Sequence, residues 1–193
     1  MQQVKRDWRW TMASGCLTLV LAIIVFFLPE LDWLPRAGVI GWLLLLAGIA
    51  EFVFGWKRGR DMVGQAAVGS GLITALAGMI FIANPLSSYF PVANVVMAWL
   101  FMRGAWMLIM APRIRASGFA QFIALSGGTD VLLGLVLLAH LPVALLVIML
   151  FGPTPEAVAR FALLLAASFA VTAVCQIAIG LLERRRSGLI AAD

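Results

Sequence analysis

Three charged residues lie inside long apolar stretches of the sequence: Glu51, Arg103 and Asp130. Acids and bases in such stretches are costly unless they pair or face water, so two carboxylates and one guanidinium predict either a buried ion pair or a relay for protons or ions. The single histidine, His140, is a fourth candidate. An imidazole with an ordinary pKa of about 6.5 can respond to external acid, and the alternative is a tolerated polar tip at a helix end.

Signatures of catalysis are missing from the sequence. One histidine excludes a His-rich metal site, and Ser126, Gly127 and Gly128 make too short a segment for a nucleotide loop. No serine or cysteine has a plausible base nearby. The two cysteines, Cys16 and Cys175, both fall inside apolar runs, which favours buried thiols over a disulfide or a metal pair. We therefore expect no enzyme activity, no cofactor and no metal.

The composition places these residues in a membrane protein. Of the 193 residues 63% are hydrophobic and the mean hydropathy is +1.04, well above the range of soluble domains. The net charge of +5 could suggest nucleic acid, but only 12% of residues are charged, and the basic ones stand in short clusters between apolar runs. Such clusters are typical of membrane topology signals, so the predicted partner is the lipid bilayer and not nucleic acid.

The elements that must position the charges form a repeat. A glycine stands fourteen positions before a proline three times, with an apolar run between: Gly15 to Pro29, Gly71 to Pro85, and Gly128 to Pro142. The frames start 56 and 57 residues apart, which leaves room for two helices each. An even number of crossings makes the repeats parallel. We predict an all-α membrane protein with six transmembrane helices, arranged as three parallel-repeated helical hairpins in one domain.

The expected helices span about 12–28, 37–56, 63–83, 92–111, 122–141 and 155–182, within repeats of about 12–58, 64–113 and 122–184. Residues 1–11 are read as a basic cytoplasmic head and 186–193 as a loose cytoplasmic tail. The third repeat carries an apolar surplus at about 143–155, broken by Gly152, Pro153 and Pro155. It predicts either a short interfacial or re-entrant segment on the non-cytoplasmic side, or a longer and strongly tilted sixth helix.

Lysine and arginine are unevenly divided between the two sides of the predicted bundle. The head, the loops after the second and fourth helices and the C-terminal run hold eleven, whereas the opposite loops hold two, Arg36 and Arg160. The positive-inside rule therefore predicts a multi-pass protein of the bacterial inner membrane with both termini in the cytoplasm.

Helical spacing assigns each intramembrane charge to a packing face. Glu51 shares its face with a stripe of glycines, Asp130 follows Ser126 and Gly127, and Arg103 lies between Trp99 and Trp106, whose indoles could shield it. Counted from the non-cytoplasmic helix ends at about 1.5 Å per residue, the three charges lie about 16 to 21 Å deep. We hypothesise that Arg103 pairs with Asp130 or Glu51, either to fix which hairpin packs where or to relay a proton or ion.

Several segments resemble the HdeD-type family of small six-helix bacterial inner-membrane proteins: GCLTLVLAIIVFFLP, GWLLLLAGIAEFVFG, GLITALAGMIFIANP and GGTDVLLGLVLLAHLP. The aspartate after the glycine, Asp130, is the most specific match, and the surplus in the third repeat departs from the usual pattern. The resemblance implies a non-enzymatic role in acid or stress resistance. The alternatives are a small transporter or channel for protons, ions or a solute with a charged path in the bundle, or a scaffold for a second copy or another membrane protein.

Overall fold

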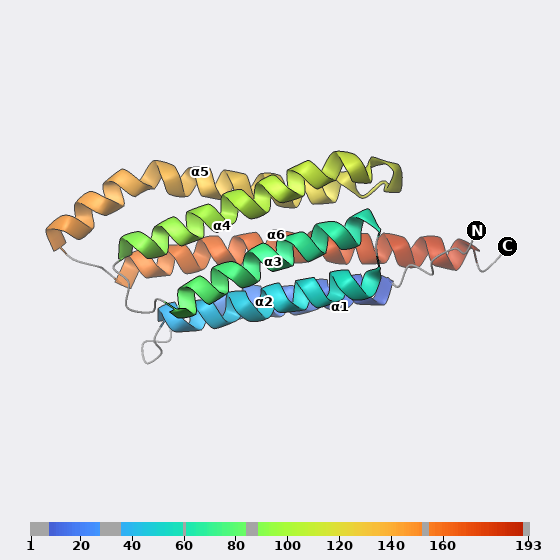
Figure 1. Cartoon of the computed structure of the whole chain (residues 1–193), viewed down its shortest axis with the longest axis horizontal. Helices are drawn as coiled ribbons and strands as arrows, with labels where there is room; N and C mark the ends of the chain where they lie inside the picture. Colours follow the sequence, from blue (N-terminus) through green and yellow to red (C-terminus); the bar gives the residue numbers. More distant parts are fainter. Residues whose placement is uncertain (1–7, 28–35, 60, 84–88, 152–154, 191–193) are drawn as a thin grey trace.

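Each apolar run of the sequence becomes one long helix of a bundle (Figure 1). In the computed structural model the described residues are 8–27, 36–59, 61–83, 89–151 and 155–190. Within these ranges only the backbone is described at 36–37, 89–93, 115–117, 140–161 and 188–190. The elements are α1 (Trp8–Phe27), α2 (Arg36–Arg58), α3 (Met62–Ala83), α4 (Tyr89–Met110), the 3₁₀ helix η2 (Ala111–Ser117), α5 (Ala120–Phe151) and α6 (Pro155–Ile190).

All six α-helices contain a segment long and apolar enough to cross a membrane, with mean hydropathy between 1.6 and 2.2. Large apolar side chains cover the outer surface of the bundle, among them Ile23, Leu132 and Val174, as lipid-facing positions require. The described residues contain no strand. The predicted fold class is therefore confirmed: an all-α membrane protein of six membrane-spanning helices with a repeated arrangement.

Short polar and glycine segments end the helices on one side of the bundle. Gly59 follows α2 with φ of 105°, and Gly118 follows η2 with φ of 74°, a left-handed backbone that glycine adopts without steric cost. Asp61 caps α3, because its carboxylate accepts a hydrogen bond from the Gly64 backbone at 2.8 Å. These turns lie at the same side as the start of α1 and the end of α6 (Figure 1). We call this side the termini end.

The closest helix pair, α2 and α3, is held by glycines at seven-residue spacing. A Cβ added at Gly48 would lie 2.3 Å from the Ala75 backbone nitrogen, and one at Gly71 would lie 2.5 Å from that of Phe52. Backbones approach this closely only where no side chain intervenes. The most extensive packing joins α2 to α3, α6 to α1 and α4 to α5. Each of these pairs links neighbouring repeats across the boundaries predicted from the sequence.

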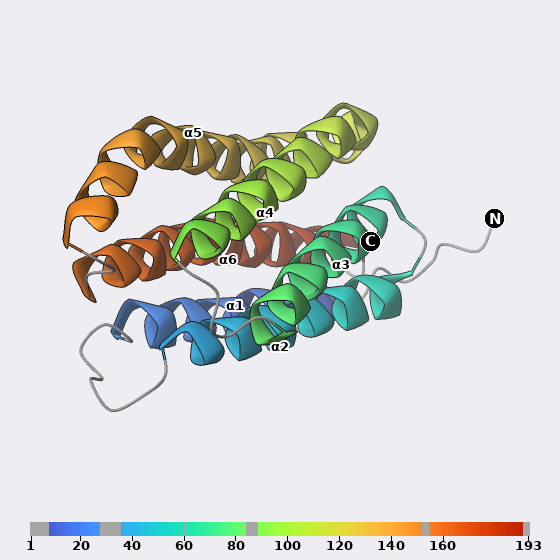
Figure 2. The same ribbon diagram turned by 60° about the vertical axis from the view of Figure 1, so that its left-hand side comes forward.

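Three expectations about the C-terminal part of the chain are wrong. Pro142 does not end the fifth helix, since α5 continues to Phe151 and bends over its last turns (Figure 2). A proline inside a helix removes one backbone hydrogen bond and kinks the helix without necessarily ending it. The surplus at 143–151 is thus an extension of α5, neither a re-entrant segment nor part of α6, which begins at Pro155. Residues 186–190 also belong to α6 and are not a loose tail.

The bundle has two halves of different character. In both views α6 runs between α1 and the α4–α5 pair, so it contacts both sides of the molecule (Figures 1 and 2). The half away from the termini end is filled by an apolar core that includes Leu44, Leu100, Leu165 and Phe169. The other half holds a second apolar cluster, which includes Met107 and Phe119, together with the buried Arg58 and Glu183.

Candidate functional site

The three predicted intramembrane charges lie together in the interior of the bundle. Glu51 from α2, Arg103 from α4 and Asp130 from α5 are 5%, 1% and 0% exposed. Arg103 Nη1 donates a hydrogen bond to Asp130 Oδ2, and Arg103 Nη2 lies 3.6 Å from Glu51 Oε1. The three residues come from one helix of each predicted repeat. We call Glu51, Arg103 and Asp130 the central charge cluster.

Hydroxyl groups complete the surroundings of Asp130. Ser168 Oγ donates to Asp130 Oδ1 at 2.5 Å, so each carboxylate oxygen has its own donor. Arg103 Nη2 also donates to Thr172 Oγ1 at 3.1 Å, and Thr172 lies 3.0 Å from Ser126 Oγ. Charge-assisted hydrogen bonds to both oxygens are the arrangement that best stabilises an ionised carboxylate away from water.

Glu51 is held less tightly than Asp130. Its Oε1 accepts a hydrogen bond from Gln176 Nε2 at 3.3 Å, a long contact, and the same oxygen is beyond hydrogen-bond range of Arg103. Two buried atoms beside it, Arg103 Nε and Gln176 Oε1, have no partner in the described structure. Buried polar atoms of this kind are normally satisfied by ordered water. Gln176 Oε1 therefore offers a place for water next to Glu51.

Aromatic side chains flank Arg103 unequally. The guanidinium carbon lies 5.9 Å from the centroid of the Trp99 ring, within the range of a cation–π contact. Trp106 instead turns to α3, where its indole nitrogen donates to the Ala66 carbonyl at 3.0 Å. Gly69 leaves the space for this ring, because a Cβ there would lie 2.2 Å from it. Of the two tryptophans expected to shield Arg103, only Trp99 does so.

A second charge cluster closes the termini end. Arg58, the last residue of α2, is 7% exposed and binds both carboxylate oxygens of Glu183 on α6, at 3.0 Å for Nη1 to Oε2. Its Nε lies 3.1 Å from Asp61, and its Nη1 also contacts the Thr11 hydroxyl of α1. We call Arg58, Asp61 and Glu183 the termini-end cluster. Arg58 was counted as a topology signal, yet the structure makes it a buried tie between α1, α2 and α6.

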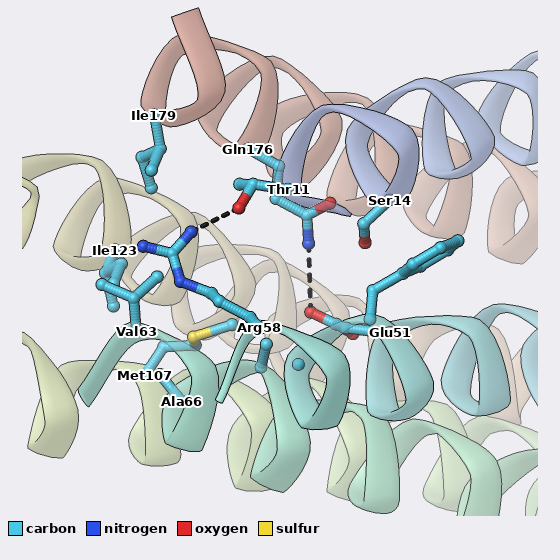
Figure 3. A pocket seen from close by; sticks show the side chains of 13 residues that line it. Thr11, Ser14, Glu51, Arg58, Val63, Ala66, Met107, Ile123, Gln176 and Ile179 are labelled. Atoms are coloured by element: carbon cyan, nitrogen blue, oxygen red, sulfur yellow. Dashed lines mark hydrogen bonds between the residues drawn. The ribbon is translucent and has the colours of Figure 1, made fainter. Parts of the chain in front are cut away.

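A pocket of about 50 Å³ lies between the two clusters (Figure 3). Its polar lining consists of Thr11 and Ser14 from α1, Glu51 and Arg58 from α2, and Gln176 from α6. Figure 3 shows Gln176 reaching Glu51 at one side of the pocket and Arg58 reaching Thr11 at the other. Apolar side chains such as Phe54, Val63 and Met107 form most of the lining, so the pocket, at about 10–15 Å³ per water molecule, offers places for water only beside its polar groups.

Beyond the central charge cluster, the interior is apolar. Trp99, Leu100 and Phe169 are at most 2% exposed there, and the Trp99 and Phe169 rings meet edge to face at 5.9 Å. The Trp99 indole nitrogen is satisfied by Thr74 at 3.1 Å. Within the described residues, polar side chains therefore lead from the termini end to the middle of the bundle and are followed by apolar packing.

Reasoning from the sequence missed the polar face of α6. Ser168, Thr172 and Gln176 recur every four residues and Glu183 follows seven later, a spacing that puts all four on one side of a helix. That periodicity was the available signal. Gln176 occupies the position of the third repeat that corresponds to Glu51 in the first, and the two side chains bind each other.

Some of the other predicted residues are described by the structure, and the rest lie outside the described residues. Gly15 and Gly71 lie at close helix contacts, whereas Gly128 has no atom within 4 Å of an added Cβ. Pro142 lies within α5. Pro29, Pro85 and the side chain of His140 lie outside the described residues. In the described ranges no three His, Cys, Asp or Glu side chains are grouped as a metal ion would require.

Comparison with known proteins finds one family. Its model, described as a short repeat of unknown function (DUF308), matches twice, at residues 13–83 and 69–139. The two matches start 56 residues apart, the interval between Gly15 and Gly71. No curated protein and no solved structure matches the chain. Because the matches together run from residue 13 to 139 of 193, the chain belongs to the family of proteins built from the DUF308 repeat.

Proposed function

We propose that this protein is an HdeD-like, non-catalytic protein of the bacterial inner membrane that contributes to acid or stress resistance, with the central charge cluster as its working part. The DUF308 repeat is the domain found in HdeD-like membrane proteins, which supports the family setting. The segments that resemble the HdeD type, Asp130 among them, support the same assignment.

One observation carries the proposal for the cluster. An ion pair that only fixed helix packing would need Arg103 and one carboxylate, and Asp130 already supplies it with a donor to each oxygen. Glu51 adds a second carboxylate at 3.6 Å from the same guanidinium, beside the pocket. Buried acids of membrane helices are by default candidates for proton or ion pathways. The second acid is the feature that a structural role leaves unexplained.

Acid survival tests the physiological part of the proposal. A deletion strain is exposed briefly to strong acid, with and without the gene restored from a plasmid, and surviving colonies are counted. We expect survival to fall on deletion and to return with the gene. Unchanged survival on deletion would contradict the role in acid resistance, although the membrane architecture would be unaffected.

The proposed orientation has its own test. Eleven lysines and arginines on the termini side against two on the other favour cytoplasmic termini. Fusion of the C-terminus to a fluorescent protein that matures only in the cytoplasm, and separately to a phosphatase active only in the periplasm, reports the side directly. Fluorescence without phosphatase activity is expected, and the reverse would overturn the orientation.

Transport of protons or small ions is the second candidate. The pocket places a few polar side chains between the central charge cluster and the termini end, and the opposite half is filled with apolar side chains. Such an arrangement favours a carrier that alternates its access over an open channel. Purified protein in vesicles with an internal pH dye would show protein-dependent proton uptake under a pH gradient. Absence of uptake would leave the cluster without a transport role.

The lipid bilayer is the proposed partner of the outer surface. Apolar side chains cover that surface, and Trp42 and Trp56 of α2 are 56% and 68% exposed. Whether a second copy or another membrane protein also binds there is answered by mass measurement of the protein released intact from detergent.

A further inference from the structure

The charges of the central cluster do not balance. Glu51 and Asp130 together carry two negative charges when ionised, and Arg103 carries one positive charge. The side chains are 5%, 0% and 1% exposed, so one unit of negative charge would remain in the membrane interior. An uncompensated buried charge costs several kcal/mol, and proteins avoid that cost by binding a proton or another cation.

Of the described side chains that line the pocket beside Glu51, only Arg58 is positively charged. Helix α3, packed against α2, has no charged residue, and α1 presents the hydroxyls of Thr11 and Ser14 to the pocket. Helix α6 contributes Gln176, the buried Cys175 thiol and Glu183.

Arg58 lines the same pocket seven residues after Glu51, but its charge is already engaged. Glu183 binds it with both oxygens, and Asp61 lies 3.1 Å from its Nε. The termini-end cluster thus also holds two acids and one base. The positive charge of Arg58 cannot neutralise Glu51, because two acids beside Arg58 already exceed that single charge.

Geometry distinguishes the two acids of the central cluster. Asp130 receives Arg103 on one oxygen and Ser168 on the other, at 2.5 Å, as an ionised carboxylate requires. Glu51 has the longer contacts, 3.6 Å to Arg103 and 3.3 Å to Gln176. A proton on Asp130 would compete with two strong donors, whereas Glu51 has the neutral Ser70 hydroxyl of α3 and the two longer contacts.

Access also distinguishes them. Glu51 lines the pocket of about 50 Å³ and Asp130 does not. The Oε1 of Gln176, buried and without a partner, lies on the same side chain that binds Glu51, so an acceptor for a water or a carboxyl proton is present. Asp61, with a side chain 23% exposed, stands at the outer side of the termini-end cluster.

We infer that Glu51 is a proton-binding site, supplied through water in the pocket from the termini end, while Asp130 remains the ionised partner of Arg103. The proton arrives from water, binds one Glu51 oxygen and leaves the cluster with no net charge. This deepens the proposed function by naming the ligand of the same cluster. Its test uses purified protein and is independent of the survival assay. Proton binding can therefore be absent although the gene restores acid survival, and it can be present although the gene does not.

Infrared difference spectroscopy of the protein in lipid, titrated with pH, reads protonated carboxyl groups directly. We expect wild type to show a carboxylic C=O band at neutral pH that is lost as the pH rises. Variants that keep the charge of the cluster assign the band: Glu51→Asp should shift it, and Asp130→Glu should leave it unchanged. A wild-type spectrum without such a band at any pH would overturn the inference, as would a band that is unchanged in Glu51→Asp and shifts in Asp130→Glu.

Wild-type protein provides a second readout in case a variant fails to fold. A hydrophobic carbodiimide adds to protonated carboxyl groups and leaves a stable acyl urea that mass spectrometry can locate. The expected adduct is on Glu51 and falls off as the pH rises. An adduct on Asp130 in its place, or no adduct on either acid, would overturn the inference.

Discussion

Replacement of Arg103 by methionine removes the only positive charge of the central cluster. Methionine keeps the length and flexibility of the side chain, so little packing volume is lost. Asp130 and Glu51 would then face each other without a cation, and Thr172 would lose its donor at 3.1 Å. Removing one partner of a buried ion pair costs about 3–5 kcal/mol, so we expect a loss of that size in the free energy of unfolding.

Cysteine burial provides the assay. Cys175 is buried and Cys16 is exposed, so in a Cys16→Ser background a thiol-reactive dye reports unfolding through Cys175. The exposed Arg185 supplies the control, because Arg185→Met removes the same charge from the surface of α6 and should change stability by no more than about 0.5 kcal/mol. Adding Asp130→Asn to Arg103→Met should cost less than the two single changes together, with a coupling of about 0.5–3 kcal/mol.

Equal unfolding midpoints for Arg103→Met and Arg185→Met would refute the reasoning. So would strict additivity of Arg103→Met and Asp130→Asn, since two residues that pair must show coupling. Either result would mean that the contact between them contributes nothing to the folded state.

Two further changes test other parts of the structure with the same dye assay. Gly48→Ala should destabilise the protein by about 1–3 kcal/mol, because the new Cβ would lie 2.3 Å from the Ala75 backbone. The matched variant Gly128→Ala has open space around the new Cβ, so it should be neutral or stabilise by up to about 1 kcal/mol through helix propensity. Equal effects of the two would contradict the close α2–α3 contact. Glu183→Gln should destabilise by about 1.5–3 kcal/mol, because the buried Arg58 loses a charged acceptor, and no change would show that this pair does not hold α2 to α6.

The fold was largely predictable because the membrane imposes simple rules on sequence. Apolar length sets the number of spans, and helical spacing puts Glu51 and Asp130 on packing faces. Burial of any of the three charges is costly without a partner, so the pairing of Arg103 with the two acids was predictable from the residue types. Depth counted along the helices supported the same grouping.

What the sequence did not reveal depends on contacts between distant segments. Nothing local distinguishes Arg58 from the exposed Lys57 before it, and only the fold brings Glu183 to it from α6. The polar face of α6 was visible in its spacing, but Ser168, Thr172 and Gln176 carry no charge to draw attention to it. Pro142 was read as a helix end, yet a long membrane helix tolerates proline, and α5 continues nine residues beyond it.

The most direct test of the account is acid survival of a strain that carries Glu51→Gln in place of the wild-type gene. Glutamine keeps the size of the side chain and its hydrogen bonding but cannot take up a proton. Thr129→Val is the matched control, because the Thr129 hydroxyl bonds to Leu125 in its own helix, outside the cluster. With equal protein in the membrane, the account predicts that Thr129→Val restores survival and Glu51→Gln does not. Full restoration by Glu51→Gln would show that the second acid of the cluster has no role in the function.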